Sequence, residues 1–342
     1  MTAKPLPATP RSAAVGPIGD LDPTVLHVLE VAAERSRFNT AGATAITPTV
    51  FRLPAANGPS GVIAKIHPPG TAREALLRQT RIATWAADNH VPTARPIGRP
   101  TSVHGTLVTF THDIGPGRHT DPEERAALLA LLHALPAPTT LGLPDVAPTA
   151  RLLRRLEAVR PSMVTDSAFR QLWIHLQQVE RLWRHSEPLT RRRVVHGDLD
   201  PSNTVVGRDG IPHLINWHAA AVGPPALDLA AEAFRRDAFG SDPREYERFH
   251  AEYGHDVTKD DTGRTYETLA ARAAAEGVIT AAEHVTRDRW WLPEYLERLA
   301  CLVGQGSPEF TYPWGWQASP RLTTLPDSPR AAVDQELVVG RG

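Results

Sequence analysis

The first third of the chain alternates short apolar runs with turn residues, a pattern typical of strands. Gly61-Val-Ile-Ala-Lys-Ile66 and Thr106-Leu-Val-Thr-Phe-Thr111 are the clearest runs, and residues 38–53 are consistent with two further short strands. A helix is expected from Thr71 to about Asn89, and another begins at Asp22-Pro23, where a proline suits the first helical turn. These elements predict a small, strand-rich lobe with one long helix inserted.

Gly115-Pro116-Gly117 consists of turn-forming residues and predicts a hinge, and beyond it the spacing of apolar residues becomes helical. Helices are expected from Asp121, around 169–183, over 226–239 and over 265–301, whereas 193–217 returns to short strands and turns. With 342 residues, the chain exceeds the about 250–300 at which a single core stops growing. We therefore predict an α+β fold with lobes at 21–113 and 114–310, a disordered tail at 1–20 and an irregular tail at 311–342.

Composition argues against several classes of protein. Lys and Arg number 37 and Asp and Glu 38, a net charge of −1, so no nucleic acid partner is expected. The single cysteine, Cys301, cannot form an internal disulfide. No run reaches the ~18 apolar residues of a membrane span, and the start lacks a hydrophobic signal region. We expect a soluble, cytoplasmic protein with no membrane contact and no obligate protein partner.

Two features single out candidate functional residues. Lysine is rare, with three in the whole chain, and Lys65 lies inside an apolar run. Asp209-Gly210 is a strong signal for a two-residue hairpin turn, and a turn centred there would place Asn203 opposite Asn216. The loop with His196 and Asp198 would then lie beside them. Such an oxygen-rich cluster suits a hard divalent cation and the phosphates that it bridges.

The order of these residues resembles the aminoglycoside phosphotransferase and choline kinase family, a branch of the protein-kinase-like fold. The resemblance rests on His196-Gly197-Asp198-x₄-Asn203, then Asn216-Trp217, then Gly223-Pro224-x₃-Asp228, and extends more weakly over residues 25–300. It implies a two-lobe protein-kinase-like fold. It also implies transfer of the γ-phosphoryl group of ATP, with Mg²⁺, to a hydroxyl group of a small-molecule acceptor.

The resemblance assigns roles to individual residues. Asp198 would be the catalytic aspartate that orients the acceptor hydroxyl. Lys65 would hold the nucleotide phosphates, and Glu74 would position Lys65. The remaining assignments are nucleotide contacts near Thr109, Phe110 and Thr111, metal ligands at Asn203 and Asn216, and structural loop positions at His196 and Asp228.

The residues themselves leave alternatives open. The family's usual metal-binding aspartate is Asn216 here, which motivates a second hypothesis: a catalytically weak or inactive relative that binds a nucleotide or another ligand. A metallohydrolase is a third reading, although it leaves Lys65 unexplained. Thr71-Ala-Arg-Glu74 is also a capping-box pattern, in which Glu74 would bond to its own helix start. A surface lysine is the alternative for Lys65, and turn-forming amides are the alternative for Asn203 and Asn216.

Overall fold

The structure is a computed structural model that describes residues 22–54, 61–115, 117–160, 166–186, 191–286 and 288–302. Contacts between residues divide the chain into two compact units. The first combines Met1–Leu143 with His196–Ala220, and the second combines Pro144–Val195 with Ala221–Gly342. The mixture of an antiparallel sheet and many helices confirms the predicted α+β class.

A five-stranded antiparallel sheet forms the centre of the first unit, in the order β1-β2-β3-β5-β4. Its strands are β1 (Thr44–Thr47), β2 (Val50–Leu53), β3 (Val62–Ile66), β4 (Pro96–Val103) and β5 (Thr106–His112). The sequence did not indicate β4, because Pro96 and Pro100 are residues that usually interrupt strands. The structure explains their presence: β4 is an edge strand, where a proline removes no central ladder bond.

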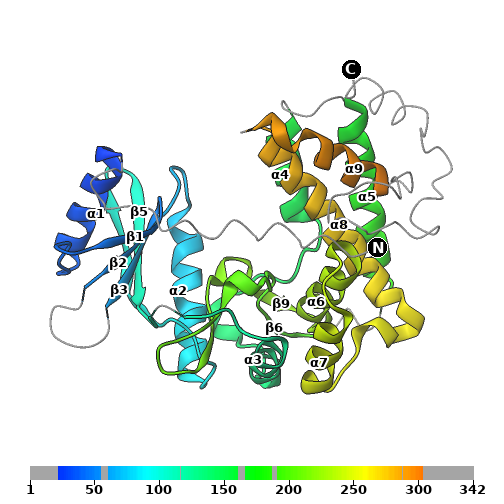
Figure 1. Cartoon of the computed structure of the whole chain (residues 1–342), viewed down its shortest axis with the longest axis horizontal. Helices are drawn as coiled ribbons and strands as arrows, with labels where there is room; N and C mark the ends of the chain where they lie inside the picture. The colour runs from blue at the N-terminus through cyan, green and yellow to red at the C-terminus, as the bar shows by residue number, and fades with distance from the viewer. Residues whose placement is uncertain are drawn as a thin grey trace, which may run out of the picture. The chain divides into compact units, whose positions relative to one another are not determined.

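Helix α1 (Pro23–Arg35) covers one face of this sheet (Figure 1). The Asp22 carboxylate accepts a hydrogen bond of 2.7 Å from the Thr24 N–H and so caps the helix start. Leu29, Ala32 and Ala33 pack against strand residues that include Phe51 and Ala64, all nearly inaccessible to solvent. Burial alternates along β3, so Ile63 and Lys65 lie on the opposite, half-exposed face. Lys65 is thus held on a rigid strand without being part of the core.

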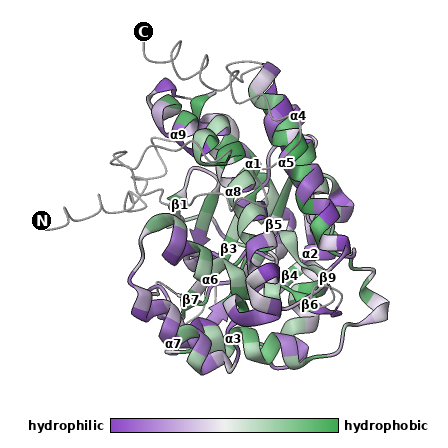
Figure 2. Cartoon of the chain, turned by 90° about the vertical axis from the view of Figure 1, so that its right-hand side faces the viewer, coloured by the Kyte–Doolittle hydropathy of each residue, from purple (hydrophilic) through white to green (hydrophobic). Residues whose placement is uncertain are grey.

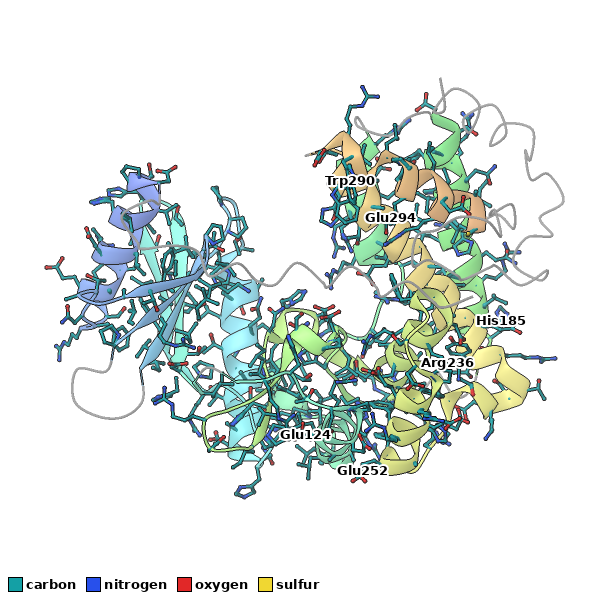
Figure 3. All side chains as sticks on the ribbon, viewed as in Figure 1. Glu124, His185, Arg236, Glu252, Trp290 and Glu294 are labelled. Atoms are coloured by element: carbon teal, nitrogen blue, oxygen red, sulfur yellow. The ribbon has the colours of Figure 1, made fainter. Side chains whose placement is uncertain are left out.

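The remaining elements of the first unit are helices and one small hairpin. Helix α2 (Arg73–Asp88) lies between β3 and β4 in the chain. Helix α3 (Pro122–Ala134) begins with a capping box between Asp121 and Glu124, the latter labelled in Figure 3. The 3₁₀ turn η2 (Thr139–Leu141) follows α3. The segment His196–Ala220 of this unit contains, in chain order, the 3₁₀ turn η5 (Pro201–Asn203), β7 (Thr204–Val206), β8 (Pro212–Leu214) and the 3₁₀ turn η6 (Trp217–Ala219).

The β7–β8 hairpin has a different register from the predicted one. Val206 pairs with Pro212, and the Gly207 N–H bonds to the Ile211 carbonyl at 2.8 Å. The connection therefore has three residues, with Gly210 in the left-handed conformation at φ 76°, instead of a two-residue Asp209-Gly210 turn. Asn203 consequently lies opposite Ile215 and not opposite Asn216, as the bond from the Ile215 N–H to the Asn203 carbonyl shows.

The second unit is mainly helical. A short antiparallel pair joins β6 (Arg193–Val195) to β9 (Ala221–Gly223). Its helices are α4 (Ala150–Val159), α5 (Asp166–Arg184), α6 (Ala226–Phe239), α7 (Pro243–Tyr253), α8 (Arg264–Val285) and α9 (Leu292–Leu302), with 3₁₀ turns η7 (Val257–Gly263) and η8 (Arg289–Trp291). Helices α4 and α5 carry both apolar and polar stretches (Figure 2), and their apolar residues join those of α8 in one core.

The predicted continuous helix over 265–301 is interrupted in the structure. Helix α8 ends at Val285, and η8 separates it from α9. Asp288 accepts a hydrogen bond of 2.9 Å from the Trp290 N–H, and Pro293 follows in the first turn of α9, where a proline is tolerated. Among the described residues, no helix is both long and apolar enough to cross a membrane.

Candidate active site

The loop after β6 begins with a packed histidine. His196 is fully buried, and its Nε2–H donates to the Ile215 carbonyl at 2.9 Å. Its ring meets the Trp217 indole edge-on, with centroids 5.2 Å apart. The next residue, Gly197, has φ 77°, and a Cβ atom there would lie 2.4 Å from the Ala219 carbonyl oxygen. The loop is therefore pressed against η6, and only glycine fits at this position.

Asn203 fixes the backbone and the side chain of Asp198. Its Nδ2 donates to the Asp198 carbonyl at 2.8 Å and to the Asp198 carboxylate Oδ2 at 3.1 Å. Asp200 caps η5 through the Ser202 N–H, which holds Asn203 in place. The Asp198 side chain remains 36% exposed. It is thus oriented by a neighbour and still accessible from solvent.

Asn216 connects this loop to the sheet. Its backbone is left-handed, with φ 67° and ψ 59°, a conformation that asparagine tolerates better than most residues. The Asn216 Nδ2 donates to Asn203 Oδ1 at 3.1 Å, although the two residues do not face each other in the hairpin register. The Asn216 Oδ1 accepts from the Lys65 Nζ at 3.5 Å. A line of hydrogen bonds therefore runs from Lys65 through Asn216 and Asn203 to Asp198.

Lys65 lies on β3 directly opposite Thr109 of β5. Burial lowers the pKa of the Lys65 ammonium from its usual 10.5. His67 follows at the end of β3 and forms a 2.8 Å hydrogen bond with the Thr109 hydroxyl. Burial, and then the positive charge of Lys65, lower the pKa of His67 to about 4, so its imidazole is neutral near pH 7.

A cavity of about 780 Å³ opens beside these residues within the first unit. Its lining includes Lys65, His67, Asn216 and two residues that the sequence analysis did not assign to a site, Gln79 and His218. The His218 Nε2 lies 3.6 Å from the Asp198 Oδ2. Two signals could have indicated these residues: Gln79 follows the buried Leu76 at helical spacing, and His218 comes two residues after Asn216.

The predicted pairing of Glu74 with Lys65 is not formed. Glu74 is exposed in the first turn of α2 and bonds to Arg81 at 2.5 Å. The alternative capping box is not formed either, because the helix N-cap is Ala72 and the Thr71 hydroxyl donates to the Pro68 carbonyl. Phe110 points into the core, where its ring lies 4.9 Å from that of Phe38.

Two further predicted residues can be located. Thr111 pairs with Ile63 on β3, two positions from the Lys65–Thr109 pair and on the same face of the sheet. Asp228 is buried in the first turn of α6, in the second unit. Burial, and then the negative charge of Asp228, raise the pKa of Tyr253 to about 12. A role of Asp228 in holding the loop at Asp198 stays a prediction.

Asp113 is a structural residue that the sequence analysis did not identify. It directly follows β5 and is 8% exposed. Its carboxylate accepts hydrogen bonds from the Arg52 Nε at 2.8 Å and from the Gly115 N–H at 2.9 Å. The Asp113 N–H donates to the Gly61 carbonyl. Asp113 thus attaches the segment that leaves β5 to strands β2 and β3.

Comparison with known proteins identifies the family. A model of the phosphotransferase enzyme family matches residues 40–271, which include the sheet, Asp198 and the Asn203–Asn216 pair. The chain belongs to this family. A search of curated proteins gives no match.

Several solved structures have the same fold as this chain, although their sequence identity to it is low. An aminoglycoside-3'-phosphotransferase of type VIII is 18% identical, with a TM-score of 0.55 over 74% of this chain and 99% of its own. Choline kinase LicA from Streptococcus pneumoniae is 16% identical, with a TM-score of 0.56 over 80% and 99%. Aminoglycoside phosphotransferase APH(3'')-Id from Streptomyces rimosus, solved with ADP and streptomycin, is 20% identical, with a TM-score of 0.50 over 71% and 97%. These likenesses confirm the protein-kinase-like fold.

The side chains predicted to bind magnesium in this phosphotransferase-family chain do not fit a resident magnesium ion. The predicted ligands Asn203 and Asn216 are neutral amides, whereas magnesium sites use one or two carboxylates together with substrate phosphates. Both amide oxygens already accept hydrogen bonds, from the Asn216 Nδ2 and the Lys65 Nζ. In the described part of the chain, no group of three or more His, Cys, Asp or Glu side chains is placed to hold a metal ion.

Proposed function

We propose that this chain transfers the γ-phosphoryl group of ATP to a hydroxyl group of a small molecule. One observation carries the proposal: the hydrogen-bonded line that joins Lys65 to Asp198 through Asn216 and Asn203. This line links the Lys65 ammonium, which can bind a phosphate group, with the Asp198 carboxylate, which can accept a hydrogen bond from a hydroxyl group. Phosphoryl transfer depends mainly on positioning and on charge stabilisation, and these two groups would supply both.

Each residue has a distinct role in the proposed reaction. The Asp198 carboxylate orients the acceptor hydroxyl and takes its proton as the new oxygen–phosphorus bond forms. Lys65 binds phosphate oxygens and stabilises the charge that develops on the leaving ADP. Asn203 keeps the Asp198 carboxylate in position through its Nδ2. The family resemblance also implies Mg²⁺, but no step of this proposal runs through the cation, because the donor set lacks the carboxylates of such a site.

Similar proteins support the classes of nucleotide and acceptor. The Streptomyces rimosus phosphotransferase was solved with ADP and streptomycin, and LicA is a choline kinase. An adenine nucleotide and a small hydroxylated acceptor are therefore proposed for this chain. Thr109 and Thr111 lie on the same sheet face as Lys65 and are the proposed side-chain contacts from β5, whereas Phe110 could contribute through its backbone.

Asp198→Asn tests the proposed function. The amide removes the proton acceptor and keeps a similar shape, so we expect turnover to fall ~10²–10⁴-fold. Nucleotide affinity should stay within a few-fold, because Asp198 faces the acceptor in this proposal. The measurement is ADP release with a panel of hydroxylated acceptors, together with ADP binding by calorimetry.

Asp200→Asn is the matched control for this experiment. Asp200 lies two residues further along the same loop, and an asparagine oxygen can still accept the hydrogen bond from the Ser202 N–H. This variant should keep its turnover. Near-normal turnover by Asp198→Asn would reject the assignment of Asp198.

A further inference from the structure

We propose that this chain binds the phosphates of its nucleotide directly through Lys65 and side-chain amides, and that this binding does not require a divalent cation. The inference rests on the proposed function, since it concerns the nucleotide of the same site. The charges and hydrogen bonds around Lys65 that support it all lie within the first unit.

The cavity beside Lys65 is poor in carboxylates. Its fourteen lining residues, all within the described ranges, contain one carboxylate, that of Asp22. This group is exposed and already accepts the Thr24 N–H at the start of α1. His67, also in the lining, is neutral near pH 7. The cavity therefore offers little negative charge to attract a divalent cation.

Within the described part of the chain, Lys65 forms no ion pair, although an ion pair is the usual arrangement of a buried ammonium. Its hydrogen bond goes to the neutral Asn216 Oδ1 at 3.5 Å, near the upper limit for such a bond. The α2 residue that shares its cavity is Gln79, also neutral, while Glu74 is paired with Arg81. The positive charge of Lys65 is thus not cancelled by these neighbours, and an anionic phosphate oxygen would be a stronger acceptor than an amide oxygen.

The two predicted metal ligands bind each other. Asn216 Nδ2 donates to Asn203 Oδ1, so the oxygen that would face a cation is already used. A magnesium ion would have to displace both this bond and the one from Lys65, and would gain only neutral amide oxygens from Asn203 and Asn216. Magnesium sheds its water reluctantly and favours carboxylates, so the exchange is unfavourable. The Lys65 ammonium and the second Nδ2 hydrogen of Asn216 are instead donors, which suit phosphate.

Affinity for ADP, measured by calorimetry with the full chain in EDTA and in Mg²⁺, tests the inference. For the unchanged protein we expect the two affinities to agree within about threefold, because no protein carboxylate needs neutralising. Lys65→Ala should weaken binding about tenfold or more under both conditions, since it removes a charge-assisted hydrogen bond.

Asn216→Asp should make the affinity for ADP depend on Mg²⁺, whereas the affinity of the unchanged protein should not depend on it. Aspartate also tolerates the left-handed backbone at this position, and it would pair with Lys65 and repel phosphate. We expect affinity in EDTA to fall about tenfold or more and Mg²⁺ to restore it. Asn39→Asp is the matched control: Asn39 is exposed, and an aspartate can still accept the Ala41 N–H, so its ADP affinity should be unchanged.

Gln79→Glu gives a second test in case Asn216→Asp does not fold. It places a carboxylate in the same cavity without touching the Asn203–Asn216 bond, and the same loss of affinity in EDTA is expected. ADP binding that needs Mg²⁺ in the unchanged protein would overturn the inference and leave the proposed function standing. Failure to bind ADP under either condition would overturn both.

Discussion

At the scale of single residues, the orientation of helix α2 about its axis decides which of its polar side chains lines the same cavity as Lys65. The inward face of α2 carries Leu76, Ile82 and Ala83, and Gln79 falls on that side. Glu74 is the only acidic residue in the first turn of α2, which made it the natural partner for a lysine in the sequence analysis. The sequence could not show that Glu74 pairs with Arg81, because Arg81 lies seven residues away and several other arginines are available as partners.

Glu74→Gln should therefore have little effect. Glu74 and Arg81 form an exposed ion pair, and such pairs contribute about 0–1 kcal/mol to the free energy of unfolding. ADP affinity should be unchanged, because Glu74 does not touch Lys65. Urea unfolding and ADP calorimetry measure the two effects. A loss of ADP affinity about as large as that of Lys65→Ala would instead restore the predicted pairing of Glu74 with Lys65.

At the scale of elements, the sequence predicted most strands and helices but not how they end and pair. The apolar alternation of β3 and β5 and the helical spacing of α2 are local signals, and the structure has these elements within a few residues of the prediction. The hairpin register depends on one extra residue in its turn, and Asp209-Gly210 fits either a two- or a three-residue loop. Asn203 and Asn216 nevertheless meet, because the left-handed backbone of Asn216 redirects its side chain.

The packing of α5 on α8 predicts a loss of stability in acid. His175 is buried, its Nε2–H donates to the Ala271 carbonyl at 3.1 Å, and burial lowers its pKa to about 4. Between pH 6.5 and 4 the unfolded chain binds a proton at this residue and the folded chain does not. The free energy of unfolding therefore falls as the pH drops through this range, by ~3 kcal/mol from this residue.

Urea unfolding at pH 7 and pH 5 measures this effect. His175→Gln keeps a side-chain donor for the Ala271 carbonyl and removes the titrating group, so its stability should fall less between the two pH values. His185→Gln is the matched control, because His185 lies exposed just after the end of α5 (Figure 3). An equal loss in the unchanged protein and in His175→Gln would contradict the prediction.

At the scale of the molecule, the two compact units are not continuous in sequence. Residues 196–220 belong with Met1–Leu143, although 52 residues of the second unit separate them. The predicted lobes at 21–113 and 114–310 are continuous stretches, since composition and periodicity report only neighbours along the chain. The motif around Asp198 indicated the fold class, but the contacts that attach its loop to the first unit are long-range and leave no local signal.

Thr93→Val tests one of these long-range attachments. The buried Thr93 hydroxyl donates to the Leu214 carbonyl at 2.6 Å and accepts from the Trp217 Nε1–H at 2.8 Å. Valine has the same shape but leaves both groups without this partner, so we expect a loss of about 1–3 kcal/mol in the free energy of unfolding. Urea unfolding measures it.

Thr44→Val is the control for Thr93→Val. Thr44 is exposed on β1, so its replacement should change the free energy of unfolding by less than about 0.5 kcal/mol. If the two variants unfolded at the same urea concentration, the Thr93 contacts would not hold the hairpin segment in the first unit.

The separation of Thr93 from Leu214 also sets a delay during synthesis. The two residues are 121 positions apart, and at a translation rate of ~5–20 residues per second Leu214 leaves the ribosome roughly 6–24 seconds after Thr93. Helix α2 is synthesised before that interval begins, and β4 and β5, which complete the five-stranded sheet, are synthesised early in it. The surface that later receives Leu214 and Trp217 remains uncovered while residues 144–195 of the other unit are made. Nascent chains that pause within this interval should therefore be those most dependent on chaperones.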